Sequence, residues 1–400
     1  MSVSPRGAAA SATDGPRPVP AWWYTARPSA RGVWSSLVVL LAAIPLLFVV
    51  YSSVQLGWDQ WMGLWSQRLP TLLWNTLSLA VLVALGCVGL GVSAAWLVVR
   101  RAFVGQRLAV WLMIMPLTIP TYVFAHIYTE LFESDGWLGA LWQGVFGADI
   151  APPELFNIFG VTFVLTLAGF SYVFLLVSDA LSRGQPAIEE AARIQGATPM
   201  EVFMKVSLPM LRPAIAAGTA LVVLHVLSDF GAVSMLRYQT FTLSIYLQMS
   251  GRFDYNAAAG LSMILVTLSL TFLILERFFR NRQRYYSLAQ SRKVVPRPAS
   301  ALEQVFIWGW LALITLFAFA LPLAWMVAWS WEAWSAQLIG AEFWGYARNS
   351  LTVSVLAASV AVVAALPVAL YHARTRNLTS QAHLQLSSVG FVLPGPVIAL

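Results

Sequence analysis

Long apolar runs separated by short polar connections dominate the sequence. Most runs reach roughly the 20 residues that a helix needs to cross the hydrocarbon core of a bilayer. They predict nine membrane-spanning helices, at residues 34–51, 72–99, 108–131, 156–178, 213–236, 257–275, 305–329, 351–371 and 384–400. The third run is interrupted by Pro116 and Pro120, which break a regular helix. Because a helix satisfies its own backbone in lipid, the pattern predicts an all-α polytopic membrane protein.

The composition agrees with this class, since 59% of the 400 residues are hydrophobic and only 10% are charged. Soluble domains have about a quarter of their residues charged, so a soluble protein is excluded. The single cysteine, Cys87, lies inside an apolar run, which rules out an internal disulfide and predicts simple burial. Gly86, Gly89 and Gly91 in the same run predict close approach of a second helix.

The net charge of +7 is consistent with either a nucleic-acid or a membrane partner, and the positions of the basic residues decide between them. Lys and Arg gather in alternate connections, with four in residues 1–33 and seven between 277 and 297. The connection between the third and fourth runs has no Lys or Arg and carries Glu130, Glu133, Asp135, Asp149 and Glu154. Positive residues are retained on the cytoplasmic side. We therefore predict a cytoplasmic N-terminus and a lipid bilayer, with no nucleic acid, as the partner.

Short motifs recur along the chain, which predicts two parallel repeats. Asn75-Thr76-Leu77 matches Asn349-Ser350-Leu351, and Pro116 matches Pro394 with an offset of 394 − 116 = 278 residues. The predicted organisation is a flexible cytoplasmic tail (1–33), a six-span repeat (34–280), a basic linker (281–303) and a second repeat (304–400). By this offset the second repeat stops after about three spans. We therefore expect the chain to be a truncated form of a twelve-span protein.

A polar loop at residues 186–209 separates the fourth and fifth runs, on the predicted cytoplasmic side. Pro186 suits a first helical turn, and Gly196 suits a helix end with positive φ. Thr198 followed by Glu201 is a capping-box pattern that begins a second helix, which we expect Pro209 to end. These residues predict two short helices. The pair is either an amphipathic connector on the lipid surface or a docking element for a partner.

The loop carries a spaced motif that resembles a known family. Glu190-Ala191-Ala192, then Gly196 and then Val206-Ser207-Leu208-Pro209 are similar to the EAA loop of ABC importer permeases, with Val in place of Ile. The resemblance implies a type I permease fold, in which this loop fits a cleft in a cytoplasmic ATPase dimer. It also implies an extracytoplasmic substrate-binding protein that delivers the cargo. The implied coupling residues are Glu190, Ala191, Ala192, Gly196, Leu208 and Pro209, with Glu190 pairing with a basic residue of the ATPase.

Nucleotide hydrolysis is predicted to need a separate subunit. A phosphate-binding loop requires Gly-Lys followed by Ser or Thr, whereas Lys205 and Lys293 are each followed by Val. We therefore expect a transport subunit that is not an enzyme and holds no cofactor. Residues 228–233, 239–242 and 245–246 are similar to the ferric-iron permeases, so the resemblance implies ferric iron as substrate. Sulfate, thiamine, polyamine and phosphonate permeases share the loop and remain alternatives.

Two groups of residues are candidates for the membrane pathway or its gate. Asp229 lies in the fifth apolar run with Phe230 and Gly231, either lining the pathway or as a carboxylate bonded to neighbouring backbone or Ser228. Pro116 and Pro120 mark either a gate or a plain kink. An ion-coupled secondary transporter would show several mid-membrane carboxylates, and Asp229 is nearly alone.

No His, Cys, Asp and Glu cluster has the spacing of a metal site, so no bound metal is expected. His126 and His225 are single imidazoles in aromatic-rich runs. They are expected to be packed and hydrogen-bonded.

Overall fold

The computed structural model describes residues 30–133, 135–147, 149–183, 186–281, 296–375, 377–387 and 395–398. Backbone contacts divide the chain into two compact units. One unit comprises Met1–Ala43 with Asn349–Ser388, and the other comprises Ile44–Arg348 with Val389–Leu400. The larger unit contains the predicted loop and the pathway candidates, so it positions the functional site.

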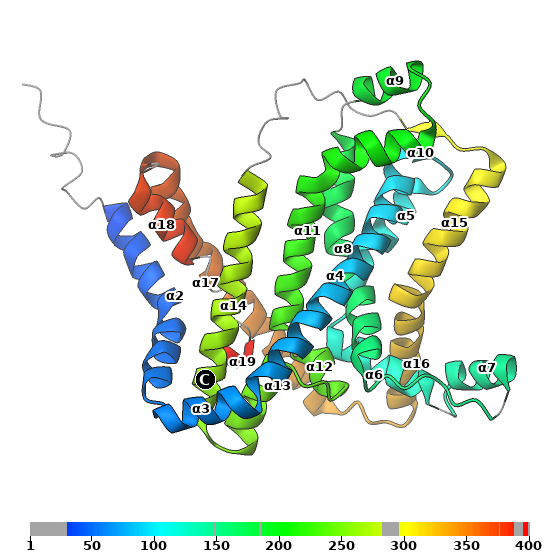
Figure 1. The fold of residues 1–400 in the computed structure, drawn as a ribbon. Coiled ribbons are helices and arrows are strands. Elements are labelled where there is room, and N and C mark those ends of the chain that lie inside the picture. Colours follow the sequence, from blue (N-terminus) through cyan, green and yellow to red (C-terminus); the bar gives the residue numbers. More distant parts are fainter. Residues whose placement is uncertain are drawn as a thin grey trace, which may run out of the picture. The chain divides into compact units, whose positions relative to one another are not determined.

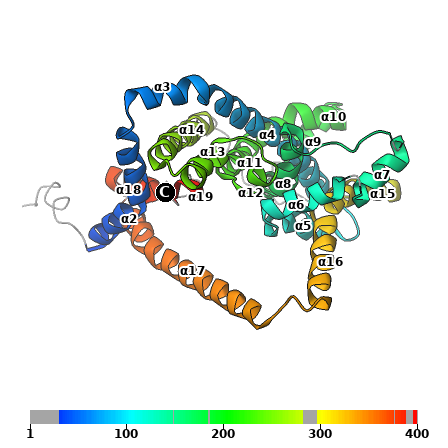
Figure 2. The same ribbon diagram turned by 90° about the horizontal axis from the view of Figure 1, so that it is seen from below.

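Three long helices form the centre of the larger unit: α4 (Leu69–Arg100), α8 (Ile158–Ser182) and α11 (Leu208–Ser228). They lie side by side in Figures 1 and 2, and each contacts the other two. The small residues of α4 explain how close this packing is. A Cβ atom on Gly86 would lie 2.7 Å from Thr166 Oγ1, and one on Gly91 would lie 2.8 Å from Val173 Cβ. The predicted close approach is therefore confirmed at these two glycines, whereas Gly89 meets no atom within 4 Å.

Further helices flank this centre. α14 (Tyr255–Asn281) contacts α11, and α15 (Ala301–Thr315) contacts α4 and α5 (Gln106–Ile114). α15 continues through the π-helical turn η5 (Leu316–Ala320) into α16 (Leu321–Ser335). The two-residue strands β1 (Arg101–Ala102) and β2 (Arg297–Pro298) pair in parallel, which joins the end of α4 to the chain before α15.

The first eight predicted spans overlap helices in the part of the chain that the structure describes, although the fifth ends earlier than predicted. Seven helices are long and apolar enough to cross a membrane, and a bent pair adds an eighth candidate. The bent pair is the predicted third span, in which α5 and the 3₁₀ turn η1 (Met115–Thr118) meet α6 (Thr121–Phe132) at 94°. The interruption at Pro116 and Pro120 is thus confirmed. The predicted ninth span, 384–400, covers the end of α18 (Leu378–Ser387) and all of α19 (Gly395–Ile398), while 388–394 and 399–400 lie outside the described residues.

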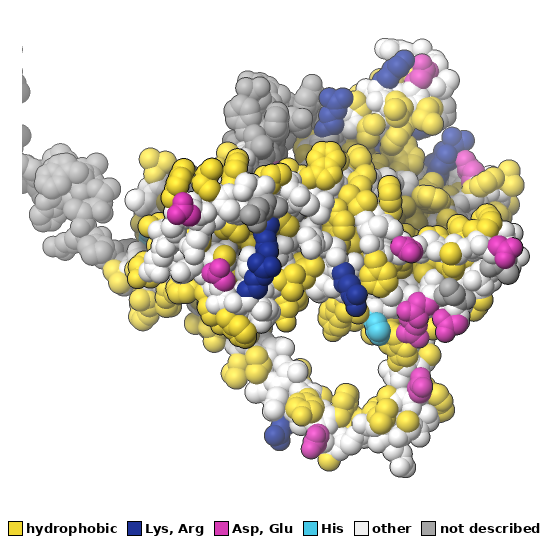
Figure 3. Space-filling model, turned by 60° about the horizontal axis from the view of Figure 1, so that its bottom comes forward, with side chains coloured by type: hydrophobic (Ala, Val, Ile, Leu, Met, Phe, Trp, Pro, Cys, Tyr) yellow, Lys and Arg dark blue, Asp and Glu magenta, His cyan; other side chains and the backbone are white. Residues whose placement is uncertain are grey.

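Short helices occupy the two ends of the larger unit. One end carries α3 (Trp58–Gln67), α12 (Gly231–Met235), α13 (Phe241–Tyr246) and the π-helical turn η3 (Leu247–Gly251). α7 (Trp137–Phe146) lies at the same end, and the loop helices α9 (Pro186–Ile194) and α10 (Pro199–Val202) lie at the opposite end (Figure 1). In Figure 3, basic side chains lie near the centre of the face, acidic side chains lie to their left, and a further group of acidic side chains lies toward the right-hand edge.

The predicted fifth span, 213–236, is corrected at its C-terminal end. α11 ends at Ser228, and Asp229 is extended, with φ −66° and ψ 126°. The apolar composition of residues 230–236 concealed this break. The break has a local cause, since the Asp229 carboxylate accepts hydrogen bonds from the amides of Ala232 and Val233 and so starts the separate helix α12.

The smaller unit contains the first part of α2 (Ala30–Val54), most of α17 (Ala341–Thr375) and α18. Ser35 Oγ and His383 Nδ1 are 2.9 Å apart, which joins α2 to α18. The Tyr371 and His383 rings lie 5.4 Å apart, which joins α17 to α18. Most of the predicted tail, 1–29, and most of the predicted linker, 282–295, lie outside the described residues.

Candidate coupling loop and broken span

The first loop helix, α9, ends at Ile194, and Gly196 forms the turn that stops it, as predicted. Gly196 has φ +89°, a conformation that side chains with a Cβ rarely adopt. Its amide donates to the Arg193 carbonyl at 2.9 Å, and the Ala197 amide donates to the Ala192 carbonyl at 3.1 Å. These two bonds form a Schellman motif, which satisfies the last carbonyls of the helix. The turn between the loop helices is therefore fixed by one glycine.

The second loop helix begins with the predicted capping box. Glu201 N donates to Thr198 Oγ1 at 3.3 Å, and Thr198 N donates to Glu201 Oε2 at 3.0 Å. Lys205 Nζ also contacts Glu201 Oε1, at 3.1 Å. Both exposed charges therefore stabilise the start of α10.

The predicted end of this helix at Pro209 is wrong. The chain continues from α10 through the π-helical turn η2 (Phe203–Ser207) directly into α11, and Pro209 lies in the first turn of α11. A proline needs an altered hydrogen-bond pattern in the preceding turn, and the wider η2 provides one. Leu208 and Pro209 thus mark a continuous junction between loop and span. The backbone therefore runs without a break from α10 into α11.

A buried ion pair attaches α9 to the rest of the larger unit. The Glu189 carboxylate, in a residue only 6% exposed, accepts hydrogen bonds from Arg100 Nη2 at 2.5 Å and Ser207 Oγ at 2.8 Å. The Arg100 guanidinium carbon lies 5.2 Å from the centre of the Trp96 ring, whose edge-to-face partner is Phe203 at 4.6 Å. We call Glu189, Arg100 and Ser207 the loop clamp. It joins α9 to the last residue of α4 and to η2.

The loop clamp was not predicted from the sequence. Glu189 stands beside Glu190 in the motif, and nothing in the spacing separates a buried carboxylate from an exposed one. The only signal was Arg100 at the end of an apolar run, where a buried guanidinium needs a counter-charge.

Of the predicted coupling residues, Glu190, Ala191 and Ala192 lie in α9 and Gly196 follows it, whereas Leu208 and Pro209 lie half-buried at the start of α11. Glu190, Ala191 and Gly196 are exposed, and Ala192 is half-buried. Two apolar side chains accompany them, since Ile194 is 88% exposed and Met200 is 69% exposed. The loop therefore exposes small and apolar side chains, while Glu189 on the buried face of α9 attaches it to Arg100 and Ser207.

The pathway candidates meet at one place, where α6 begins and α11 ends. The Asp229 carboxylate is 6% exposed and accepts a hydrogen bond from Thr121 Oγ1 at 2.5 Å. It also accepts bonds from the amides of Ala232 and Val233, at 3.0 and 3.3 Å. A Cβ on Gly231 would lie 2.8 Å from Thr121 Oγ1. The structure therefore favours the interpretation of Asp229 as a backbone-bonded carboxylate, with Thr121 in the place expected for Ser228.

The remaining pathway candidates surround this junction. Pro116 is buried in η1, and Pro120 is the exposed residue that precedes α6. The half-buried ring of Phe230 lies 4.8 Å from that of Tyr246. The Asp229 carboxylate thus connects the broken span to α12 through its bonds to Thr121 and to two α12 amides.

The two candidate histidines pack against aromatic rings. His126 lies 5.1 Å from Trp329 and His225 lies 5.6 Å from Tyr172. Among the residues that the structure describes, no group of three or more His, Cys, Asp and Glu residues is arranged to hold a metal ion.

Comparisons with known proteins place the chain in a family. Residues 87–285 match the family described as binding-protein-dependent transport system inner membrane component. The chain is also 30% identical over 379 residues to the Fe(3+)-transport system permease protein FbpB 2 of Haemophilus influenzae, covering 92% of this chain and 70% of that protein. The chain is a permease of this family.

Other relatives of the permease carry different substrates in their names. It is 29% identical over 243 residues to the sulfate transport system permease protein CysT of Salmonella typhimurium, covering 59% of this chain and 86% of that protein. A solved bacterial ABC transporter involved in the import of the acidic polysaccharide alginate has a TM-score of 0.50 and 17% identity, covering 60% of this chain and 89% of that one. That likeness shows the fold. The protein is therefore an inner-membrane ABC importer permease with the type I fold, a transport subunit, as the EAA motif implied.

Proposed function

We propose that this permease imports ferric iron, delivered by an external binding protein, and is coupled to a separate ATPase dimer through residues 186–209. In this proposal the N-terminus and the loop lie in the cytoplasm. Residues 34–280 form one permease repeat, and residues 304–400 belong to a second.

The observation that carries the coupling proposal is the two-sided construction of α9. The loop clamp holds the buried side through Glu189, while Glu190, Ala191 and Ile194 are exposed on the other. Small and apolar side chains on a rigid short helix suit insertion into a cleft of a partner, and Glu190 adds a charge for a basic residue there. Because α10 continues into α11, a push on the loop reaches a membrane span directly.

Two observations support ferric iron over the other substrates of the family. The similarity to the Fe(3+)-transport permease extends over 92% of the chain, whereas the similarity to the sulfate permease covers 59%. Residues 228–233 and 239–242, which resemble the ferric-iron permeases, also form the junction around Asp229. Sulfate import is the second candidate, because sulfate permeases match at nearly the same identity.

The coupling proposal is tested by Glu190→Ala and Gly196→Val, measured by co-purification of the ATPase and by uptake. Both changes should weaken ATPase association and lower uptake. Glu201→Gln is the matched control, because its carboxylate stabilises α10 from an exposed position and leaves α9 unchanged. Normal association and normal uptake in both variants would exclude the loop as the coupling element.

The substrate is tested separately, in a strain that lacks the gene. Loss of uptake of labelled ferric iron, restored by the gene, is the expected result. Loss of sulfate uptake with normal iron uptake would replace ferric iron by sulfate and leave the coupling proposal intact.

A further inference from the structure

A polar cavity of about 440 Å³ opens at the end of the larger unit that carries α3 and η3. Its wall includes Arg68, between α3 and α4, and Arg252, which ends η3. Gln239, Ser244 and Thr71 add polar side chains. The loop clamp lies at the opposite end of the larger unit, so this cavity is separate from the proposed coupling loop.

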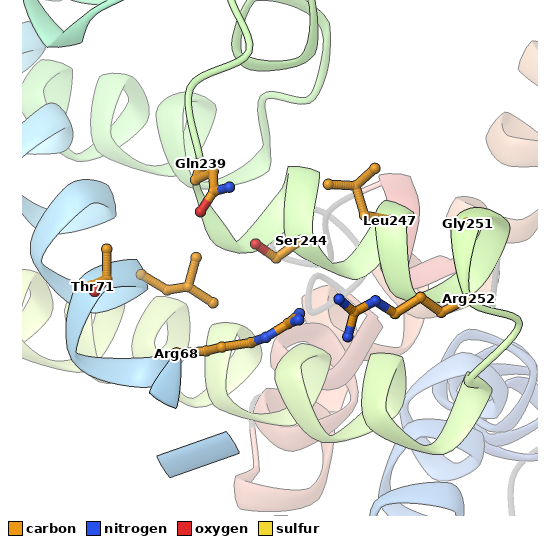
Figure 4. A pocket seen from close by; sticks show the side chains of 8 residues that line it. Arg68, Thr71, Gln239, Ser244, Leu247, Gly251 and Arg252 are labelled. Atoms are coloured by element: carbon orange, nitrogen blue, oxygen red, sulfur yellow. The ribbon is translucent and has the colours of Figure 1, made fainter. Parts of the chain in front are cut away.

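The two arginines converge in this cavity. Figure 4 shows the guanidinium groups of Arg68 and Arg252 pointing toward one another from separate segments. No Asp or Glu lines the cavity, and neither arginine forms an ion pair with another residue in the described ranges. Two cations that face each other repel, so an anion placed between them reverses the sign of the interaction. The guanidinium donors match the oxygens of a phosphate-like anion.

Thr71, Gln239 and Ser244 supply polar groups to the remaining wall, which Leu72, Leu247 and Gly251 complete. Ser244 is largely buried, and Figure 4 shows its hydroxyl pointing into the same space as the arginines. The backbone of Gln239 is fixed to α4, because Asn75 Nδ2 donates to its carbonyl at 3.0 Å. The Phe241 amide donates to Thr76 Oγ1 at 3.4 Å, which fixes the start of α13. The cavity is thus formed by anchored elements, which keeps its donors in position.

We propose that this cavity binds a phosphate-like oxyanion between Arg68 and Arg252. This oxyanion has two potential sources: a dissolved anion such as phosphate or sulfate, and the phosphate of an anionic lipid headgroup. In both cases the two guanidinium groups supply the charge and the Ser244 hydroxyl supplies a neutral donor.

The first arm of the test uses the full chain in nanodiscs of zwitterionic lipid. Inorganic phosphate or sulfate is titrated to about 10 mM and binding is measured by calorimetry. Saturable binding is expected, about tenfold or more weaker in Arg68→Gln and in Arg252→Gln, because each loses a charge-assisted hydrogen bond. Arg237→Gln is the matched control, since this exposed arginine lies in the nearby connection and does not line the cavity.

The second arm measures lipid retention by native mass spectrometry in mixed micelles that contain phosphatidylglycerol. If the native chain retains phosphatidylglycerol and both Arg68→Gln and Arg252→Gln lose it, the bound anion is the phosphate of the lipid headgroup. Arg252→Lys keeps the charge and should retain part of the binding, which separates loss of charge from misfolding. The proposal is overturned if neither anion nor lipid binds, or if Arg237→Gln weakens binding as much as the two cavity variants.

Discussion

Replacing Glu189 by alanine tests the loop clamp most directly. The change removes the carboxylate that pairs with Arg100 and accepts the Ser207 hydroxyl, while both partners stay in place. The side chain of Arg100 is only 12% exposed, so its guanidinium would keep its charge with neither a counter-ion nor full hydration. The expected result is release of α9 from the end of α4, with the spans still folded.

The free-energy cost of the Glu189→Ala change follows from the burial of its ion pair with Arg100. Breaking a buried ion pair on one side costs about 3–5 kcal/mol. Arg100 ends α4, where its long stem can turn the guanidinium toward water, so we expect the lower value, about 3 kcal/mol. At about 1.4 kcal/mol for each factor of ten, the detached population of α9 rises about a hundredfold.

Hydrogen exchange measured by mass spectrometry on the purified permease checks this value. The amides of α9 in Glu189→Ala should exchange about a hundredfold faster, while those at the centre of α8 keep their rates. Glu190→Ala is the matched control, because its carboxylate is exposed beside the clamp. The double change of Arg100→Met with Glu189→Leu removes both charges and should restore most of the protection. Equal exchange in Glu189→Ala and the native chain, or equal acceleration in Glu190→Ala, would refute the reasoning.

Three further predictions concern other contacts. Gly91→Leu should lower the thermal stability of the detergent-solubilised permease by about 1–3 kcal/mol, because α8 leaves no space for a side chain, whereas Gly89→Leu should have little effect. Asp229→Ala removes the acceptor for Thr121 and should abolish uptake while ATPase association persists; retained uptake would contradict this role. Gly196→Ala places a Cβ at φ +89° and should destabilise the loop turn by about 1 kcal/mol, measured as faster exchange at the end of α9.

The sequence alone determined the membrane class, the approximate positions of the first eight spans and the starts of the two loop helices. These features depend on local properties, namely the length of apolar runs and the chemistry of caps and turns. Gly196 and the Thr198 capping box were predicted because their hydrogen bonds join residues within a few positions of one another. The break at Pro116 and Pro120 followed from proline geometry for the same reason.

Only the tertiary structure decided which charged and polar groups meet. Glu189 and Glu190 are chemically identical neighbours, and their burial depends on the helix face that α9 turns toward Arg100, 89 positions earlier in the chain. Likewise, the Asp229 carboxylate accepts a hydrogen bond from Thr121, 108 positions earlier in the chain, and this contact joins the broken span to α12. The sequence also failed to predict the π-helical turn η2. The Leu208-Pro209 pair by itself predicts a helix end, whereas in the structure the helix continues through η2 into α11. Contacts of this kind join distant segments through packing, which a local pattern does not encode.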